Sequence, residues 1–222
     1  MKKFTTKELC LMAVFTALIS AFSQLSVPLP GGVPMTLQTY IIPVAGIVLG
    51  PQLGFFAALV YILLGAAGAP VFANFSGGFA AIAGMTGGFL VSFPLMALLA
   101  GLGDQTGRKA GEASRVSYYS LLVLFLIAGT IVNYAVGTFW FVAMTGSTVG
   151  AALAACVVPF IPTTILKIIL TVLTAPVLKR ASPLPCRHHG KCCKGSRKHG
   201  GIKKEKHETA SAPPAVYPGL QR

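Results

Sequence analysis

Charged residues are scarce in this sequence and are missing from long parts of it. Only 10% of the 222 residues are charged, and none of those between Leu9 and Leu102 is. Hydrophobic residues make up 54% of the chain, and the mean hydropathy is +0.74. Since about a quarter of the residues in a typical soluble domain are charged, this composition excludes an ordinary soluble protein. It predicts an all-α integral membrane protein of the cell membrane, crossing it several times.

Acidic residues are the scarcest charged type, with 5 Asp and Glu against 18 Lys and Arg. The basic residues behind the net charge of +13 are confined to the N-terminus, to residues 108–115 and to the chain from Lys179 onward, apart from Lys167. A nucleic-acid-binding face would instead spread basic residues over a folded surface. We therefore expect no nucleic-acid partner.

Two other absences limit the chemistry. The phosphate-binding pattern G-x-x-x-x-G-K-[ST] does not occur, so this chain is not expected to hydrolyse ATP. Two of the 5 cysteines, Cys10 and Cys156, are isolated in apolar segments, where they are expected to act as small packing residues. Nothing in the cysteine spacing indicates a disulfide framework.

Apolar runs predict six transmembrane helices. The second and third are short for a hydrocarbon core of about 30 Å, which needs about 20 residues, so a paired or tilted arrangement is expected for them. Gly46, Gly50 and Gly54 recur every fourth residue there, a spacing typical of close helix contacts. The predicted helices are Glu8–Val27, Thr39–Leu49, Leu53–Leu64, Phe79–Leu102, Val116–Met144 and Pro162–Leu178.

The loops between these helices differ in charge. Six helices place both termini and the 103–114 loop on one side, and all basic clusters fall on that side. The opposite loops, about 28–38, 66–80 and 145–159, contain no lysine or arginine. Because cytoplasmic loops carry the excess of positive charge, both termini are predicted to be cytoplasmic. The opposite loops would then enclose an outward-facing ligand cavity.

The chain divides into a six-helix membrane domain, residues 1–180, and a basic tail, residues 181–222. The tail is polar and rich in lysine and proline, which predicts disorder on the cytoplasmic side. Its cysteines and histidines match no structural zinc spacing, so we expect no metal and no cofactor. They are Cys186, His188, His189, Cys192, Cys193 and His199.

Lys167 is the residue that most strongly indicates function. It is the only charged residue between Arg115 and Lys179, and a lysine at the centre of a membrane helix costs about 2.5–3.5 kcal/mol on insertion scales. Pro162 suits the first turn of the last helix, which places Lys167 inside the membrane. A helix N-terminus with a nearby ammonium favours an anion. The alternative is that Lys167 extends to the membrane interface.

Alanine recurs every fourth residue along the first predicted helix, at Ala13, Ala17 and Ala21. Such a stripe of small residues allows another helix to approach closely. The second helix could belong to this chain or to a partner subunit, and the spacing alone does not distinguish the two.

Several short stretches together resemble the BioY family, the biotin-specific substrate-binding (S) components of energy-coupling-factor transporters. The likeness covers about residues 8–179. One departure is clear, because the family's last-helix motif usually has an aspartate where this sequence has Thr164. The matching stretches are Val33–Thr39, Leu49–Pro51, Leu64–Phe72, Ser76–Gly78, Thr86–Phe89 and Pro159–Pro162 with Lys167.

The resemblance implies a subunit that captures biotin from outside. A transmembrane coupling subunit and two cytoplasmic ATPase subunits would then drive uptake, and the alanine stripe would face the coupling subunit. Two alternatives are an S component for another small anionic vitamin and a membrane enzyme that uses Lys167. The candidate ligand-binding residues are Lys167, Thr164, Thr36, Gln38, Thr39, Asn74, Thr86, Gly87, Tyr134 and Trp140.

We predict that the biotin carboxylate pairs with Lys167, since a buried charge left alone is costly. Polar residues of the outward loops are then candidates for hydrogen bonds to the ureido ring, and Tyr134 and Trp140 are candidate walls. Lys167 could equally donate a hydrogen bond to the ureido carbonyl.

Overall fold

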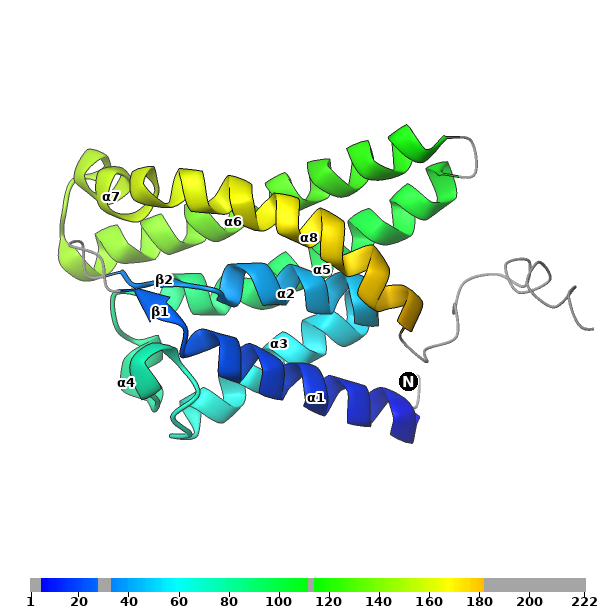
Figure 1. The fold of residues 1–222 in the computed structure, drawn as a ribbon. Helices are drawn as coiled ribbons and strands as arrows, with labels where there is room; N and C mark the ends of the chain where they lie inside the picture. The colour runs from blue at the N-terminus through cyan, green and yellow to red at the C-terminus, as the bar shows by residue number, and fades with distance from the viewer. Residues whose placement is uncertain (1–4, 28–32, 112–113, 182–222) are drawn as a thin grey trace, which may run out of the picture. The chain divides into compact units, whose positions relative to one another are not determined.

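The computed structural model describes residues 5–27, 33–111 and 114–181 (Figure 1). The predicted tail and its Cys/His tract lie outside the described residues. The elements are α1 (Thr6–Ser23), β1 (Ser26–Val27), β2 (Met35–Thr36), α2 (Gln38–Leu49), α3 (Pro51–Ala66), the 3-10 turn η1 (Ala73–Phe75), α4 (Phe79–Ile82), α5 (Gly87–Ala110), α6 (Arg115–Thr145), α7 (Val149–Cys156), the 3-10 turn η2 (Val158–Phe160) and α8 (Ile161–Ala181).

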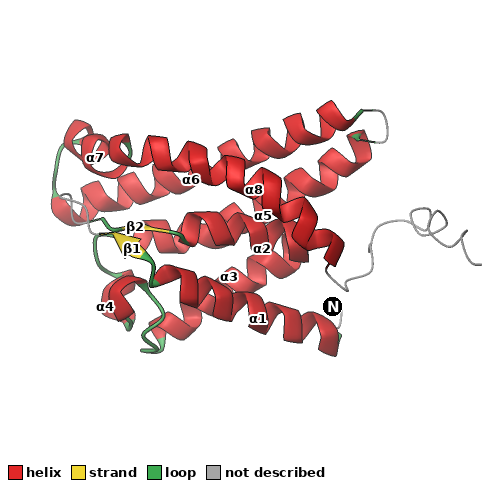
Figure 2. Cartoon of the chain, viewed as in Figure 1, coloured by secondary structure: helices red, strands yellow, loops and turns green. Residues whose placement is uncertain are grey.

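Helices account for nearly all of the regular structure (Figure 2), which confirms the predicted all-α class. The exception is a short antiparallel pair in which Ser26 lies opposite Thr36 and Val27 opposite Met35. The first predicted helix therefore ends at Ser23 rather than at Val27. The pairing joins the end of α1 to the segment that leads into α2.

Four helical stretches of the described chain are long and apolar enough to cross a membrane: Thr6–Ser23, Gly87–Lys109, Arg115–Thr145 and Val149–Thr174. α2 and α3 are apolar but have only 12 and 16 residues, which at 1.5 Å per residue is short of a full crossing. Large apolar side chains such as Phe139, Ile165 and Leu173 are exposed on the outer helix faces, as expected for a surface that faces lipid.

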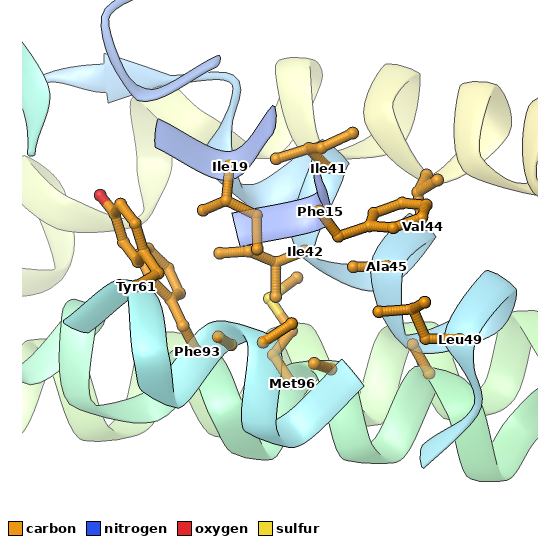
Figure 3. Packing of buried hydrophobic residues seen from close by; sticks show 14 of the residues in the cluster. Phe15, Ile19, Ile41, Ile42, Val44, Ala45, Leu49, Tyr61, Phe93 and Met96 are labelled. Carbon is orange, nitrogen blue, oxygen red and sulfur yellow. The ribbon is translucent and has the colours of Figure 1, made fainter. Parts of the chain in front are cut away.

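The core lies between α1, α2, α3 and α5. Ile19 of α1, Ile42 of α2 and Tyr61 of α3 are all fully buried there, and Figure 3 shows them facing Phe93 and Met96 of α5. These side chains interlock because each helix presents one apolar face to the others. The core thereby fixes the inner helices around which the ligand-facing segments are built.

Glycines allow α2, α3 and α5 to approach closely, as predicted. A Cβ on Gly46 would lie 2.0 Å from the carbonyl oxygen of Ala97, and one on Gly54 would lie 2.6 Å from the Cα of Gly46. Gly50 has a different role, because it turns the chain between α2 and α3 with φ of +89°, a conformation that favours glycine.

Two predicted boundaries were wrong. The expected helix from Phe79 to Leu102 is broken after Ile82 and restarts at Gly87. The expected polar loop over residues 103–114 is instead helix as far as Ala110. The helix continues because Asp104, which is 1% exposed, is satisfied by Arg108 at 3.0 Å and by the Tyr118 hydroxyl at 2.9 Å.

The described elements place β1, β2, α4 and α7 at one end of the helices (Figure 1). The start of α1, the end of α5, the start of α6 and the end of α8 lie at the opposite end. Lys7, Arg108, Lys109 and Arg115 belong to this second end. The grouping of charges expected from the sequence is therefore present in the fold.

Candidate ligand-binding site

Lys167 lies on the inner face of α8 and is 8% exposed. Its ammonium group donates to the backbone carbonyl oxygen of Thr36 at 2.6 Å and to the Thr39 hydroxyl at 2.9 Å. Pro162 is the second residue of α8, as predicted. Among the described residues, no acidic side chain pairs with Lys167. The ammonium thus has one N–H left for a ligand and no protein counter-charge in the described chain.

The segment before α2 is held by side-chain hydrogen bonds. The Thr36 hydroxyl donates to Gln38 Oε1 at 2.8 Å, and Gln38 Nε2 donates to the Tyr61 hydroxyl at 2.5 Å. Tyr61 in turn donates to the backbone carbonyl of Val71 at 3.2 Å. This chain of contacts ties the β2–α2 corner, which carries the acceptors of Lys167, to the loop after α3.

The loop after α3 is also tied to the end of α1. Gln24 donates to the carbonyl oxygen of Phe72 at 3.1 Å and accepts from the backbone N–H of Phe75 at 2.9 Å. The Ser26 hydroxyl donates to Asn74 Oδ1 at 2.6 Å. Asn74 has a left-handed φ of 58°, a conformation that asparagine tolerates better than most residues. The contacts from Gln24 and Ser26 hold this turn in place.

These segments surround a cavity of about 260 Å³. Lys167 lies on one wall, the β2–α2 corner on another, and the Asn74 turn on a third. Seven of the ten candidate ligand-binding residues line it: Lys167, Thr36, Gln38, Thr39, Asn74, Thr86 and Tyr134.

Thr164 lies beside this cavity rather than in its wall. It lines a much smaller space of about 10 Å³ that also borders Lys167 and Tyr134. Its hydroxyl is 2.5 Å from the hydroxyl of Tyr134. The family's motif usually has an aspartate at the position of Thr164, and this chain has a neutral pair of hydroxyl groups there.

Trp140 and Gly87 are brought together by helix packing and do not line the cavity. Trp140 Nε1 donates to the Gly84 carbonyl oxygen at 3.0 Å. A Cβ on Gly87 would lie 1.6 Å from the carbonyl oxygen of Ile82, and one on Gly88 would lie 2.3 Å from the Trp140 Cβ. The glycines of the Thr86-Gly87-Gly88 stretch therefore allow α5 to begin close to α6.

Several residues of the cavity wall were not predicted from the sequence. Asn133 is 1% exposed and lines both the larger and the smaller space. Tyr134 was predicted as a site residue, and Asn133 is its neighbour in the sequence. Successive residues of a helix point about 100° apart, so this neighbourhood alone did not place Asn133 in the cavity wall. The apolar walls also went unpredicted: they are formed largely by Phe72, Phe89, Phe93 and Phe160.

The two cysteines expected to act as packing residues differ in burial. Cys156 is buried and lines the cavity, whereas Cys10 is exposed and is not the packing residue that was expected.

The alanine stripe lies on the outer face of α1. Ala13, Ala17 and Ala21 are all exposed, whereas Met12 and Ile19 on the opposite face are buried in the core. The stripe is therefore not used for packing within the described chain. Of the two interpretations left open by the spacing, this placement favours contact with a partner.

Comparison with known proteins agrees with this architecture. The family model described as "BioY family" matches residues 1–184. The chain belongs to the BioY family. It is 41% identical over 173 residues to a protein of Pyrococcus horikoshii named "Probable biotin transporter BioY", covering 78% of this chain and 96% of that protein. It is 34% identical over 174 residues to "Biotin transporter BioY" of Thermotoga maritima, with the same shares covered.

A solved structure has the same fold. The crystal structure of the S-component for biotin from an ECF-type ABC transporter matches with a TM-score of 0.70 and 27% sequence identity. The match covers 80% of this chain and 95% of that one. The fold is therefore that of an ECF S-component, and the chain is a multi-pass membrane protein.

Proposed function

We propose that this chain is the substrate-binding membrane subunit of a biotin uptake transporter. Family membership and the names of the relatives support biotin as the ligand. The family consists of transporter components, so the chain is not an enzyme. The observation that carries the proposal is Lys167, a buried ammonium with one free N–H in the wall of a cavity of about 260 Å³.

The cavity suits a small ligand that has both apolar and polar parts. Ligand pockets range from about 300 to 1,000 Å³, so this cavity of about 260 Å³ lies just below that range. Phenylalanine side chains cover part of the wall, and Lys167, Thr39 and Asn74 add polar groups at separate points. We propose that biotin lies between these walls, with Lys167 as the charged contact and Thr36, Gln38, Thr86 and Tyr134 close to the ligand.

Trp140, Gly87 and Thr164 are proposed as supporting residues. Trp140 and Gly87 fix the distance between α5 and α6. Thr164 positions the Tyr134 ring through the contact between their hydroxyl groups. A change at any of the three would then act on the ligand through the residue that it holds.

Competition with other vitamins tests the choice of ligand. Purified protein loaded with labelled biotin should release it to unlabelled biotin and keep it in the presence of a hundredfold excess of other small anionic vitamins. Efficient displacement by a second vitamin would support the alternative S component. The bound biotin should be recovered chemically unchanged.

We propose six membrane-embedded helices, α2 and α3 forming a short tilted pair, with both termini cytoplasmic. The described basic residues at one end of the fold support this orientation by the positive-inside rule. With the native cysteines replaced, Ser147→Cys should react with an impermeant maleimide in intact cells. Lys109→Cys, a matched position at the opposite end, should react only after the membrane is permeabilised. The reverse pattern would invert the topology and place the cavity on the cytoplasmic side.

A further inference from the structure

Asn133 is buried on α6 with its amide nitrogen held by α5. Nδ2 donates to the Ser92 hydroxyl oxygen at 2.7 Å and to the carbonyl oxygen of Phe89 at 3.2 Å. The side chain is 1% exposed and lines the cavity beside Lys167. A side-chain amide has an NH₂ group that donates and an oxygen that accepts, and both need hydrogen-bond partners when the side chain is buried.

The hydrogen bonds fix which end of the amide faces α5. A backbone carbonyl can only accept a hydrogen bond, and the Ser92 hydroxyl donates its single proton to that same Phe89 oxygen at 2.8 Å. Both atoms must therefore accept from Asn133, so its nitrogen faces them and Oδ1 faces away. Among the described residues, no group donates a hydrogen bond to Oδ1. The atom is also not enclosed by protein, because the buried side-chain atom found without a partner in the described chain is Thr138 Oγ1.

We infer that Asn133 Oδ1 accepts a hydrogen bond from a ligand N–H and thereby selects the ligand. This inference rests on the proposed function, since biotin carries N–H groups only on its ureido ring. The two hydrogen bonds that Nδ2 donates hold the amide in place, so it cannot rotate to offer a donor where Oδ1 now lies. This oxygen favours an N–H and repels a carboxylate, since two acceptor oxygens cannot pair.

The same contact decides how biotin is oriented. Asn133 and Lys167 both line the larger cavity and the small space beside it, so the ureido ring lies at this shared part of the wall. A ureido group offers an N–H next to a carbonyl oxygen, and the wall offers an acceptor at Asn133 and an N–H donor at Lys167. The ammonium then donates to the ureido carbonyl, which is the second of the two orientations left open by the sequence.

Ligand analogues test this contact without altering the protein. In two cyclic carbamate analogues of biotin, one or the other ureido N–H is replaced by oxygen, which removes a donor with little change in shape. The purified protein should bind at least one of them on the order of 10- to 100-fold more weakly than biotin, because Oδ1 would be left buried against an acceptor. Binding is measured by calorimetric titration.

Variants then assign the loss to Asn133. Asn133→Ala should weaken biotin and bring the ratio between biotin and the poorer analogue close to one; Ser92 still donates to Phe89 in this variant. Asn133→Leu, which keeps the side-chain volume, serves as a second truncation. Thr138→Val on the same helix, outside the cavity wall, should keep the full ratio.

The possible results separate the two claims. If the protein binds biotin and both analogues within about threefold, the Asn133 contact is wrong and biotin binding stands. An unchanged ratio in the Asn133 variants would equally overturn the contact. If the variants do not fold, the comparison of analogues on the unaltered protein still decides whether the site recognises a ureido N–H of the ligand. Failure of the unaltered protein to bind biotin would overturn the proposed function and, with it, this inference.

Discussion

Lys167→Met should weaken biotin binding by about 1.5–3 kcal/mol, the usual range for a hydrogen bond from a charged group. Methionine fills a similar volume but cannot donate to the ureido carbonyl. It also leaves the Thr36 carbonyl and the Thr39 hydroxyl without the ammonium that now joins them to α8. Leu166→Met is the matched control, since the neighbouring Leu166 is exposed on the outer face of the same helix. That variant should bind biotin as the parent does.

Biotin methyl ester distinguishes the two orientations in the same experiment. With the ureido ring at Lys167, the parent and Lys167→Met should prefer the acid over the ester by the same factor. If the preference for the acid disappears in Lys167→Met, the carboxylate meets the lysine, as we first predicted from the absence of a counter-charge. The ureido orientation and the Asn133 contact would then both be contradicted.

Leucine at both Ala13 and Ala17 should abolish assembly with the coupling subunit and leave biotin binding intact. We propose the exposed alanines as the contact surface for that subunit, because small side chains let two helices approach closely. Two isobutyl groups would hold the helices apart and prevent the close packing. Co-purification with the coupling subunit and biotin uptake by cells measure the loss, while titration of the isolated chain measures binding.

Ala143→Leu is the control for added bulk on a membrane-facing surface. Ala143 is exposed on α6, so leucine there should leave both assembly and binding unchanged. The partner interpretation fails if the α1 variant assembles normally. It fails equally if that variant loses biotin binding while assembly survives, because the stripe would then support the fold of this chain.

The sequence predicted the elements that depend on local composition. The apolar runs gave the positions of α2, α3, α6 and α8 to within a few residues, because apolar runs of this length form helices in a membrane. Lys167 was predicted as a site residue because its charge is out of place in such a run. Its contact with Thr39, 128 positions away in the chain, was not predicted.

The helix faces could not be predicted with the same success. Trp140 lies seven residues after Asn133, so both project from the same side of α6. Asn133 reaches the cavity, whereas Trp140 packs against Gly88 of α5. What separates them is the close approach of α5 at its glycine-rich start, which depends on both helices together.

A buried polar group caused the error over residues 103–114. Asp104 led us to predict a loop, but it lies inside a helix with Arg108 and Tyr118 as partners. Tyr118 comes from the following helix, so the pairing required the antiparallel contact of α5 and α6. Composition alone could not indicate that this carboxylate is satisfied.

Titration of the purified chain with biotin tests the central claim most directly. The account predicts saturable binding of one biotin per chain without any partner subunit, and a marked loss of affinity in Lys167→Met but not in Leu166→Met. Absence of binding by a folded parent protein would contradict the account. Equal binding by the parent and Lys167→Met would also contradict it, because the cavity beside Lys167 would then not be the biotin site.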